Sequence, residues 1–303
     1  MRHITIFVFL LVSAFVYSQK KNVTIVLDAG HGGKDPGHLP HNKKYQQEKA
    51  LTLIISKKLE GYLSNNLVNV NVKQTRTGDT YPSLDKRVEI ANGNNADLFI
   101  SLHINGNPKA NVRGTETHIH NRSSKKALKL ANYIEHQFKT RAGRKSRGIK
   151  TSADRGGNFQ VLKFTKMPSV LVECGFITNS TEGAYLNSTY GQEIIASAIF
   201  RAIRKYLKET YPNIKFTKDA ASKETHDGVI YKVQIMSSID PVEIDIPEFK
   251  KLDTAVERVK MDSKSMYKYK YFIGKFKSHK DAKKLQKKVQ DQGFKDAFIV
   301  RIE

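Results

Sequence analysis

Two histidines and one glutamate stand where this sequence could build a metal site. His31 directly follows the apolar run VTIVLDAG, and His103 lies near the end of a second apolar run, DLFISLHIN. Both runs read as buried strands, whose carboxyl ends form the binding edge of an α/β sheet. Glu48 stands in the first turn of an expected helix. Spacing alone is weak evidence, but two imidazoles and a carboxylate with an open fourth position form a recurrent catalytic zinc arrangement. We therefore expect one Zn²⁺ on His31, Glu48 and His103.

A hydrolase built on this site also needs a base. Glu173 lies near the end of the very apolar run SVLVECGF, where a carboxylate is costly unless it has a function or a cationic partner. Near zinc-bound water it could take the proton as the water attacks a carbonyl, then pass it to the departing amine. A buried ion pair with Arg155 or Arg76 stays open as the alternative. Asn105 and Arg155 are the predicted substrate-binding residues of this domain.

Three other candidates are less suited to chemistry. Cys174 follows apolar strand positions, whereas a catalytic thiolate needs an adjacent base, so we expect a core residue. His118 and His120 share one face of a strand, and we expect them to face solvent. The segment GHGGKD lacks the spacing of a phosphate-binding loop.

The elements that must position these residues alternate between strands and helices from residue 23 to about 207. This order predicts an α/β domain with a mostly parallel sheet flanked by helices. The expected strands lie at residues 23–30, 68–76, 97–105 and 114–120, the expected helices at 51–63, 84–92, 124–140 and 194–206, and the apolar runs FQVLK and SVLVECGF precede the last helix.

The first residues have the layout of a secretory signal peptide. A basic start precedes an apolar run, Ile4 to Tyr17, which is too short for a permanent membrane anchor. The expected signal is residues 1–18, with cleavage after Ser18 and export to the periplasm or cell envelope. No later stretch is long enough to cross a bilayer, so we expect no stable membrane insertion of the mature chain. The single cysteine excludes a disulfide framework.

The formal net charge is +23, from 52 Lys and Arg against 29 Asp and Glu. Such an excess normally indicates an acidic partner. Export argues against nucleic acid, and neither a helix-turn-helix nor a zinc-finger pattern is found. Carboxylate-rich cell-wall peptides are a better match, while most of the lysines are expected to be solvated surface.

The C-terminal part of the chain has its own pattern. Residues 209–228 are polar and aperiodic and are predicted to be a linker. Residues 229–303 follow the order β-α-β-β-α-β, which predicts a small ferredoxin-like α+β domain.

Four segments resemble, in order, the motifs of the zinc-dependent N-acetylmuramoyl-L-alanine amidases of the Amidase_3 family. They are LDAGHGGKDPG, QQEKALTLIISKKL, TRTGDTYPSLDKRVEIANGNNADLFISLHINGN and MPSVLVECGFITNSTEG, within residues 22–208. The resemblance implies zinc ligands His31, Glu48 and His103, the catalytic carboxylate Glu173, and hydrolysis of the amide between the lactyl group of N-acetylmuramic acid and L-alanine in peptidoglycan. It also implies a part in cell-wall remodelling and daughter-cell separation.

The C-terminal segments YKVQIMSS, YFIGKF and GFKDAFIV resemble a SPOR domain, a module associated with glycan strands that have lost their stem peptides. Gln234 and Phe272, with Met236 and Gly274, are expected to contribute to a sugar-binding face, or alternatively to the core. Parity places Gln234 and Met236 on one face.

Two other functions compete with the amidase interpretation. One is a zinc peptidase that cuts the stem peptide itself, and the other is a catalytically silent wall-binding protein. The presence of all three ligand positions and the base disfavours the silent protein.

Overall fold

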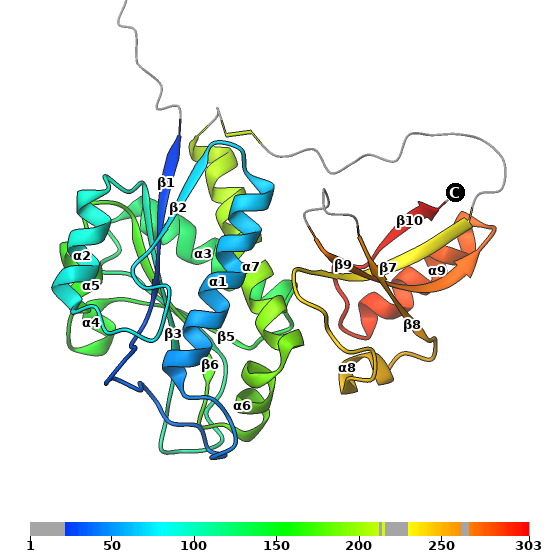
Figure 1. The fold of residues 1–303 in the computed structure, drawn as a ribbon, viewed down its shortest axis with the longest axis horizontal. Coiled ribbons are helices and arrows are strands. Elements are labelled where there is room, and N and C mark those ends of the chain that lie inside the picture. The colour runs from blue at the N-terminus through cyan, green and yellow to red at the C-terminus, as the bar shows by residue number, and fades with distance from the viewer. Residues whose placement is uncertain (1–21, 212–213, 216–229, 262–266, 303) are drawn as a thin grey trace, which may run out of the picture.

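The computed structural model describes residues 22–211, 214–215, 230–261 and 267–302 (Figure 1). The expected signal peptide, residues 1–18, lies outside the described residues, as does most of the expected linker, residues 209–228. The described residues form one six-stranded and one four-stranded sheet.

The six-stranded sheet belongs to a mixed α/β domain. Its order is β2-β1-β3-β6-β4-β5, and all neighbouring strands are parallel except β4 and β6. The prediction of a mostly parallel sheet flanked by helices is confirmed. The strands are β1 (Val23–Ala29), β2 (Val70–Gln74), β3 (Leu98–Asn105), β4 (Thr115–His118), β5 (Ser146–Lys150) and β6 (Ser169–Phe176).

Helices cover both faces of this sheet (Figure 1). The larger core lies beneath α1, α3 and α7, and a smaller apolar cluster packs against α2 and α5. The run FQVLK forms α5, and the short elements β5, α4 and α6 were not anticipated from the sequence. The helices are α1 (Glu48–Asn66), α2 (Leu84–Gly93), α3 (Lys125–Thr140), α4 (Ser152–Arg155), α5 (Gln160–Phe164), α6 (Ser180–Asn187) and α7 (Thr189–Thr210).

The C-terminal domain is built around an antiparallel sheet in the order β10-β7-β9-β8, with its own apolar core. Its elements follow the predicted sequence of strands and helices. They are β7 (Ile230–Ser238), α8 (Pro247–Lys250), β8 (Val256–Lys260), β9 (Tyr269–Phe276), α9 (His279–Asp291) and β10 (Phe298–Ile302).

A bulge in β7 overturns one prediction about this sheet. Gln234 pairs with Phe272, but Met236 pairs with Tyr271, so the register shifts between them. Since an extra residue reverses the alternation of side chains, Gln234 and Met236 do not share a face. Met236 joins the core instead.

The end of α7 and the apolarity of the helices bear on two predictions. Helix α7 ends at Thr210, so the first two residues of the expected linker are helical. Among the described residues, no helix is both long enough and apolar enough to cross a membrane.

Candidate functional site

Three neighbouring strands place acidic and imidazole side chains in one row. Cα pairing sets His103 of β3 beside Glu173 of β6, and Glu173 beside Glu116 of β4. Paired residues on adjacent strands project from the same face of a sheet. The row therefore crosses the sheet where β3 and β6 approach their carboxyl ends.

His31 joins this row from a strained turn after β1. Its backbone has φ 62°, a left-handed conformation that is uncommon for a residue with a side chain. Arg87 holds the turn by donating from Nη2 to the carbonyl of His31 at 2.8 Å. Asp35 Oδ2 lies 2.8 Å from His31 Nδ1, which leaves Nε2 to face Glu48.

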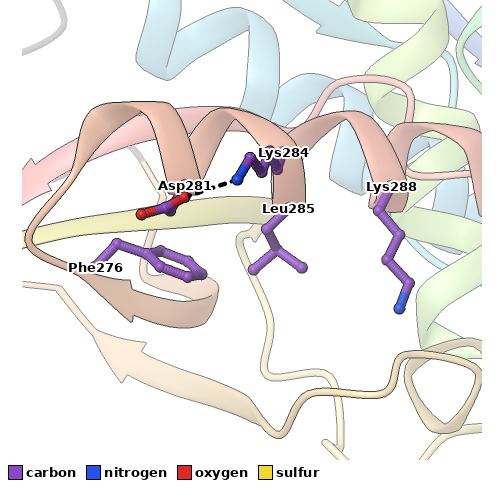
Figure 2. A pocket seen from close by; sticks show the side chains of 5 residues that line it. All are labelled: Phe276, Asp281, Lys284, Leu285 and Lys288. Carbon is purple, nitrogen blue, oxygen red and sulfur yellow. Dashed lines mark hydrogen bonds and ion pairs between the residues drawn. The ribbon is translucent and has the colours of Figure 1, made fainter.

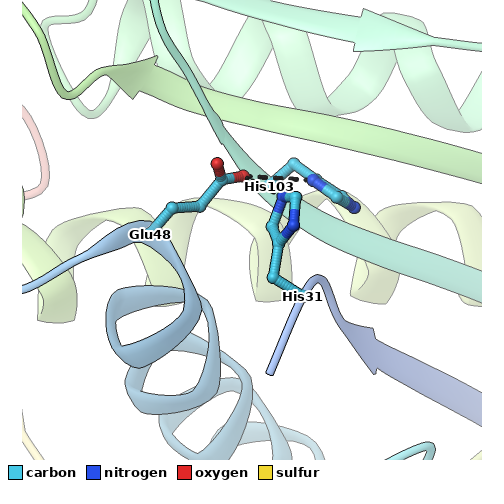
Figure 3. A group of neighbouring side chains, drawn as sticks. All are labelled: His31, Glu48 and His103. Atoms are coloured by element: carbon cyan, nitrogen blue, oxygen red, sulfur yellow. Dashed lines mark hydrogen bonds and ion pairs between the residues drawn. The ribbon is translucent and has the colours of Figure 1, made fainter. Parts of the chain in front are cut away.

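Glu48 joins the two histidines (Figure 3). It begins α1 and is only 1% exposed. Its Oε1 lies 3.0 Å from His31 Nε2 and 3.1 Å from His103 Nδ1, and accepts a bond from Ile104 N at 2.8 Å. Oε2 accepts a bond from His38 N at 2.7 Å. Both carboxylate oxygens are therefore fixed in place.

The chemistry of this triad suits a divalent metal. The three potential ligand atoms of His31, Glu48 and His103 all lie within 4.8 Å of one another. Burial raises the pKa of Glu48, but hydrogen bonds and charge from both histidines outweigh it and leave the pKa well below its ordinary value. A Cβ atom on Gly30 would lie only 2.4 Å from Nε2 of His103, which is too close for two non-bonded atoms. Glycine at position 30 therefore leaves room for the His103 ring. Two imidazoles and an ionised carboxylate are a fitting donor set for zinc.

Glu173 lies beside the triad and forms no ion pair with any residue that the structure describes. It is 8% exposed, and its Oε2 has no hydrogen-bond partner among the described residues. Arg76 donates to main-chain carbonyls instead, and Arg155 acts on Glu173 only through its charge. Burial, followed by the negative charges of Glu48 and Glu116, raises the pKa of Glu173 well above its ordinary value. A carboxyl group in this environment is suited to holding and transferring a proton.

Glu116 and His118 are site neighbours that sequence reasoning missed. Glu116 Oε1 accepts a bond from Arg147 Nε at 2.5 Å. The expectation that His118 faces solvent is wrong: it is 5% exposed, its ring packs edge-on against Phe159, and burial lowers its pKa to about 4. All four residues of β4 are buried, so both faces of the strand around His118 are covered. The alternating pattern of GTETHIH indicated which side chains share a face of the strand, but it did not indicate that the face carrying His118 would be buried.

The predicted substrate-binding residues fall in two places. Asn105 ends β3 two residues beyond His103, and its Oδ1 accepts a bond from the amide of the next residue at 2.9 Å. Arg155 ends α4 and is exposed, with its guanidinium 3.4 Å from the centre of the Phe159 ring. Gln234 and Phe272 belong to the C-terminal sheet and take no part in the metal triad.

Cys174 follows Glu173 in β6 and therefore points to the opposite face, into the larger core. Burial raises the pKa of its thiol far above the ordinary value. The thiol is thus protonated at neutral pH and remote from the row, as expected for a core residue.

The C-terminal domain carries a shallow pocket beside α9 (Figure 2). Phe276 and Leu285 supply its apolar lining, and Asp281 pairs with Lys284 at 3.2 Å. It lies in a different domain from the metal triad.

Residues 25–205 match the family of N-acetylmuramoyl-L-alanine amidases, Amidase_3. AmiA, an N-acetylmuramoyl-L-alanine amidase of Salmonella typhimurium, is 34% identical over 222 residues, which cover 60% of this chain and 75% of AmiA. LytC, an amidase of Bacillus subtilis, is 34% identical over 202 residues, covering 65% of this chain and 39% of LytC. The catalytic domain of the amidase CwlV from Bacillus (Paenibacillus) polymyxa var. colistinus superposes with a TM-score of 0.56 at 35% identity, covering 61% of this chain and 98% of that domain.

The protein therefore belongs to the Amidase_3 family of N-acetylmuramoyl-L-alanine amidases. It is a cell-wall hydrolase that acts on peptidoglycan amides.

Proposed function

We propose that the amidase is zinc-dependent, with one Zn²⁺ held by His31, Glu48 and His103 and with Glu173 as its catalytic carboxylate. The observation that carries the proposal is a three-atom donor set within 4.8 Å, next to a buried carboxyl oxygen that has no partner among the described residues. The bond cleaved joins the lactyl group of N-acetylmuramic acid to L-alanine of the stem peptide.

Bound zinc would supply Lewis-acid activation of water and of the amide carbonyl. Glu173 takes the proton from the attacking water and delivers it to the nitrogen of L-alanine, so that the amine leaves neutral. Asp35 and Arg87 keep the His31 ring and turn in place during this exchange. Asn105 and Arg155, at the border of the row, contact the substrate.

Metal analysis and product analysis test this proposal together. His31→Ala and His103→Ala should each lose bound zinc and activity, because each removes one of three ligands. Mass spectrometry of digested muropeptides should find intact stems beginning with L-alanine. Stoichiometric zinc in both variants would refute the ligand set, and stems cut internally would identify a zinc peptidase instead.

We also propose that residues 1–18 direct export to the periplasm and that the amidase helps to separate daughter cells. The basic start and short apolar run support export. Cell fractionation and microscopy of a deletion strain test both points. Retention in the cytoplasm would refute export, and normal separation would refute the division role.

For residues 229–303 we propose a ferredoxin-like, SPOR-like domain that binds denuded glycan strands. The strand order β10-β7-β9-β8 supports this, as does a row formed by Phe298, Gln234 and Phe272 across three strands. Gln234 and Phe272 are themselves buried, while Phe298 is 47% exposed and offers a ring for stacking on sugar. Gln234 Oε1 has no hydrogen-bond partner among the described residues.

Binding can be measured with the full chain carrying Glu173→Gln, which should leave the wall uncut. Amidase-treated sacculi should retain this protein better than intact sacculi, with only weak salt dependence. Adding Phe298→Ala should reduce retention. Better binding to intact sacculi that salt abolishes would indicate electrostatic attraction to stem carboxylates instead.

A further inference from the structure

A buried ion pair lies between the two domains. Lys58 of α1 is 6% exposed, and its Nζ is 2.8 Å from Glu193 Oε1 of α7. The same Nζ is 2.6 Å from Asp240 Oδ2, in the loop after β7 of the C-terminal domain. Tyr62 donates to Glu193 Oε2 at 2.6 Å. Asp240 thus reaches a buried charge network of the catalytic domain.

Apolar contacts flank this network. Ile239 packs on Gly61, where a Cβ would lie 2.7 Å from its Cδ1. Glycine inside a helix costs about 1 kcal/mol relative to alanine, and here it allows the close approach of the second domain. Near the start of α7, Tyr190 meets Phe249 of α8 with ring centres 6.0 Å apart.

A second ionic contact lies further along α7. Asp296, between α9 and β10, is 3.1 Å from Arg201 Nη1 and 2.9 Å from Arg141 Nη1 at the end of α3. Arg141 also donates to the carbonyl of Lys295 at 2.9 Å. These contacts involve a different loop of the C-terminal domain from the one that carries Asp240.

We propose that the C-terminal domain is docked in one fixed position on the surface formed by α1, α7 and the end of α3. Contacts at Asp240, Phe249 and Asp296 involve three different segments of the C-terminal domain and reach α1, α7 and the end of α3, so they restrain its rotation as well as its position. Pairing of Lys58 with two carboxylates also favours the docked state, because a buried charge needs its partners.

Docking couples the C-terminal domain to the metal triad through one helix, α1. Lys58 lies ten residues after Glu48 on α1, about 15 Å along the helix axis. The surface that carries Phe298 would then stand at a set distance from the amide to be cut. This consequence rests on the proposed wall-binding role, whereas docking itself does not.

Charge reversal in the full chain tests docking independently of wall binding. Asp240→Lys combined with Asp296→Lys places lysine opposite Lys58 and the two arginines, with both changes made on partly or well exposed side chains. The matched control is Asp245→Lys with Asp291→Lys, which changes net charge equally at exposed positions. Small-angle scattering should give the same radius of gyration for wild type and control and a larger one for the reversed chain. Hydrogen exchange around Lys58 should accelerate only in the reversed chain.

The proposal is overturned if the reversed chain scatters and exchanges like the wild type, or if the wild-type curve already requires a spread of interdomain distances. Soluble muropeptides should be cleaved at the wild-type rate by all three proteins, since no substituted residue contacts the metal triad. If the reversed chain does not fold, the milder double variant with Asp240→Ala and Asp296→Ala replaces it. This variant should show a smaller increase in the radius of gyration and in hydrogen exchange around Lys58, and no increase in either would also refute docking.

Discussion

Two buried glutamates of the catalytic domain have opposite surroundings. Glu193 accepts bonds from Lys58 and Tyr62, so each of its oxygens has a partner. Glu173 has one oxygen that no described residue hydrogen-bonds, and its pKa is strongly raised. A buried carboxylate that is fully paired holds elements together, whereas one left unpaired keeps its proton exchangeable and is suited to catalysis.

The largest expected effect follows from replacing the unpaired glutamate. Glu173→Gln should lower turnover on muropeptides about 10²–10⁴-fold, because general acid–base help is removed. Zinc content and melting temperature should remain at or above the wild-type values, since a buried carboxyl without a cationic partner contributes no ion pair. Near-normal turnover would reject Glu173 as the proton carrier.

Replacing the paired glutamate should instead damage stability. Glu193→Ala leaves Lys58 with only the partly exposed Asp240, and breaking a buried pair on one side typically costs about 3–5 kcal/mol. Urea unfolding measures this loss, while zinc content and turnover of the folded protein should persist. The exposed pair of Lys86 with Glu89 provides the control, where Glu89→Ala should change stability little. Equal losses of stability in the two variants would show that the buried pairing of Glu193 contributes no more than the exposed pairing of Glu89.

Asp28 extends the comparison to acid stability. Despite burial, the charge of Arg87 and hydrogen bonds from Thr75 and Ser101 lower the pKa of Asp28 below 3.8 in the folded protein. The ionised Asp28 carboxylate therefore contributes its full stabilisation above pH 3.8. This contribution is lost as the pH falls through the lower pKa that Asp28 has in the folded protein. Asp28→Asn should cost about 1.5–3 kcal/mol at pH 7. Urea titrations should show that the difference in unfolding free energy between this variant and the wild type becomes smaller below pH 3.8. A difference that does not change with pH would show that the Asp28 charge is not its cause.

The smallest effect is expected at the other buried titratable group of β6. Cys174→Ala should leave turnover and zinc content unchanged, because the thiol lies on the core side of the sheet. Stability should fall by about 1 kcal/mol from lost packing. Loss of turnover in a folded, zinc-loaded variant would restore the thiol as a catalytic candidate.

The sequence predicted the positions of the triad because each residue lies at the end of a strongly patterned element. His31 follows one apolar run, His103 lies near the end of another, and Glu48 begins a periodic helix. In a parallel sheet the carboxyl ends of the strands meet at one edge, which brings these side chains together. The mostly parallel sheet could be predicted for the same reason, from alternating strands and helices. Short elements without a clear period, such as β5 and α4, could not.

What the sequence determined by itself was local: periodicity, element ends and the residue types placed there. Strand neighbours and register were decided only in the tertiary structure. Glu116 meets Glu173 because β4 runs antiparallel beside β6, and Met236 turns into the core because of a bulge in β7. The contact of Lys58 with Asp240 joins residues 182 positions apart. Such pairings depend on how whole elements pack, and no local pattern encodes them.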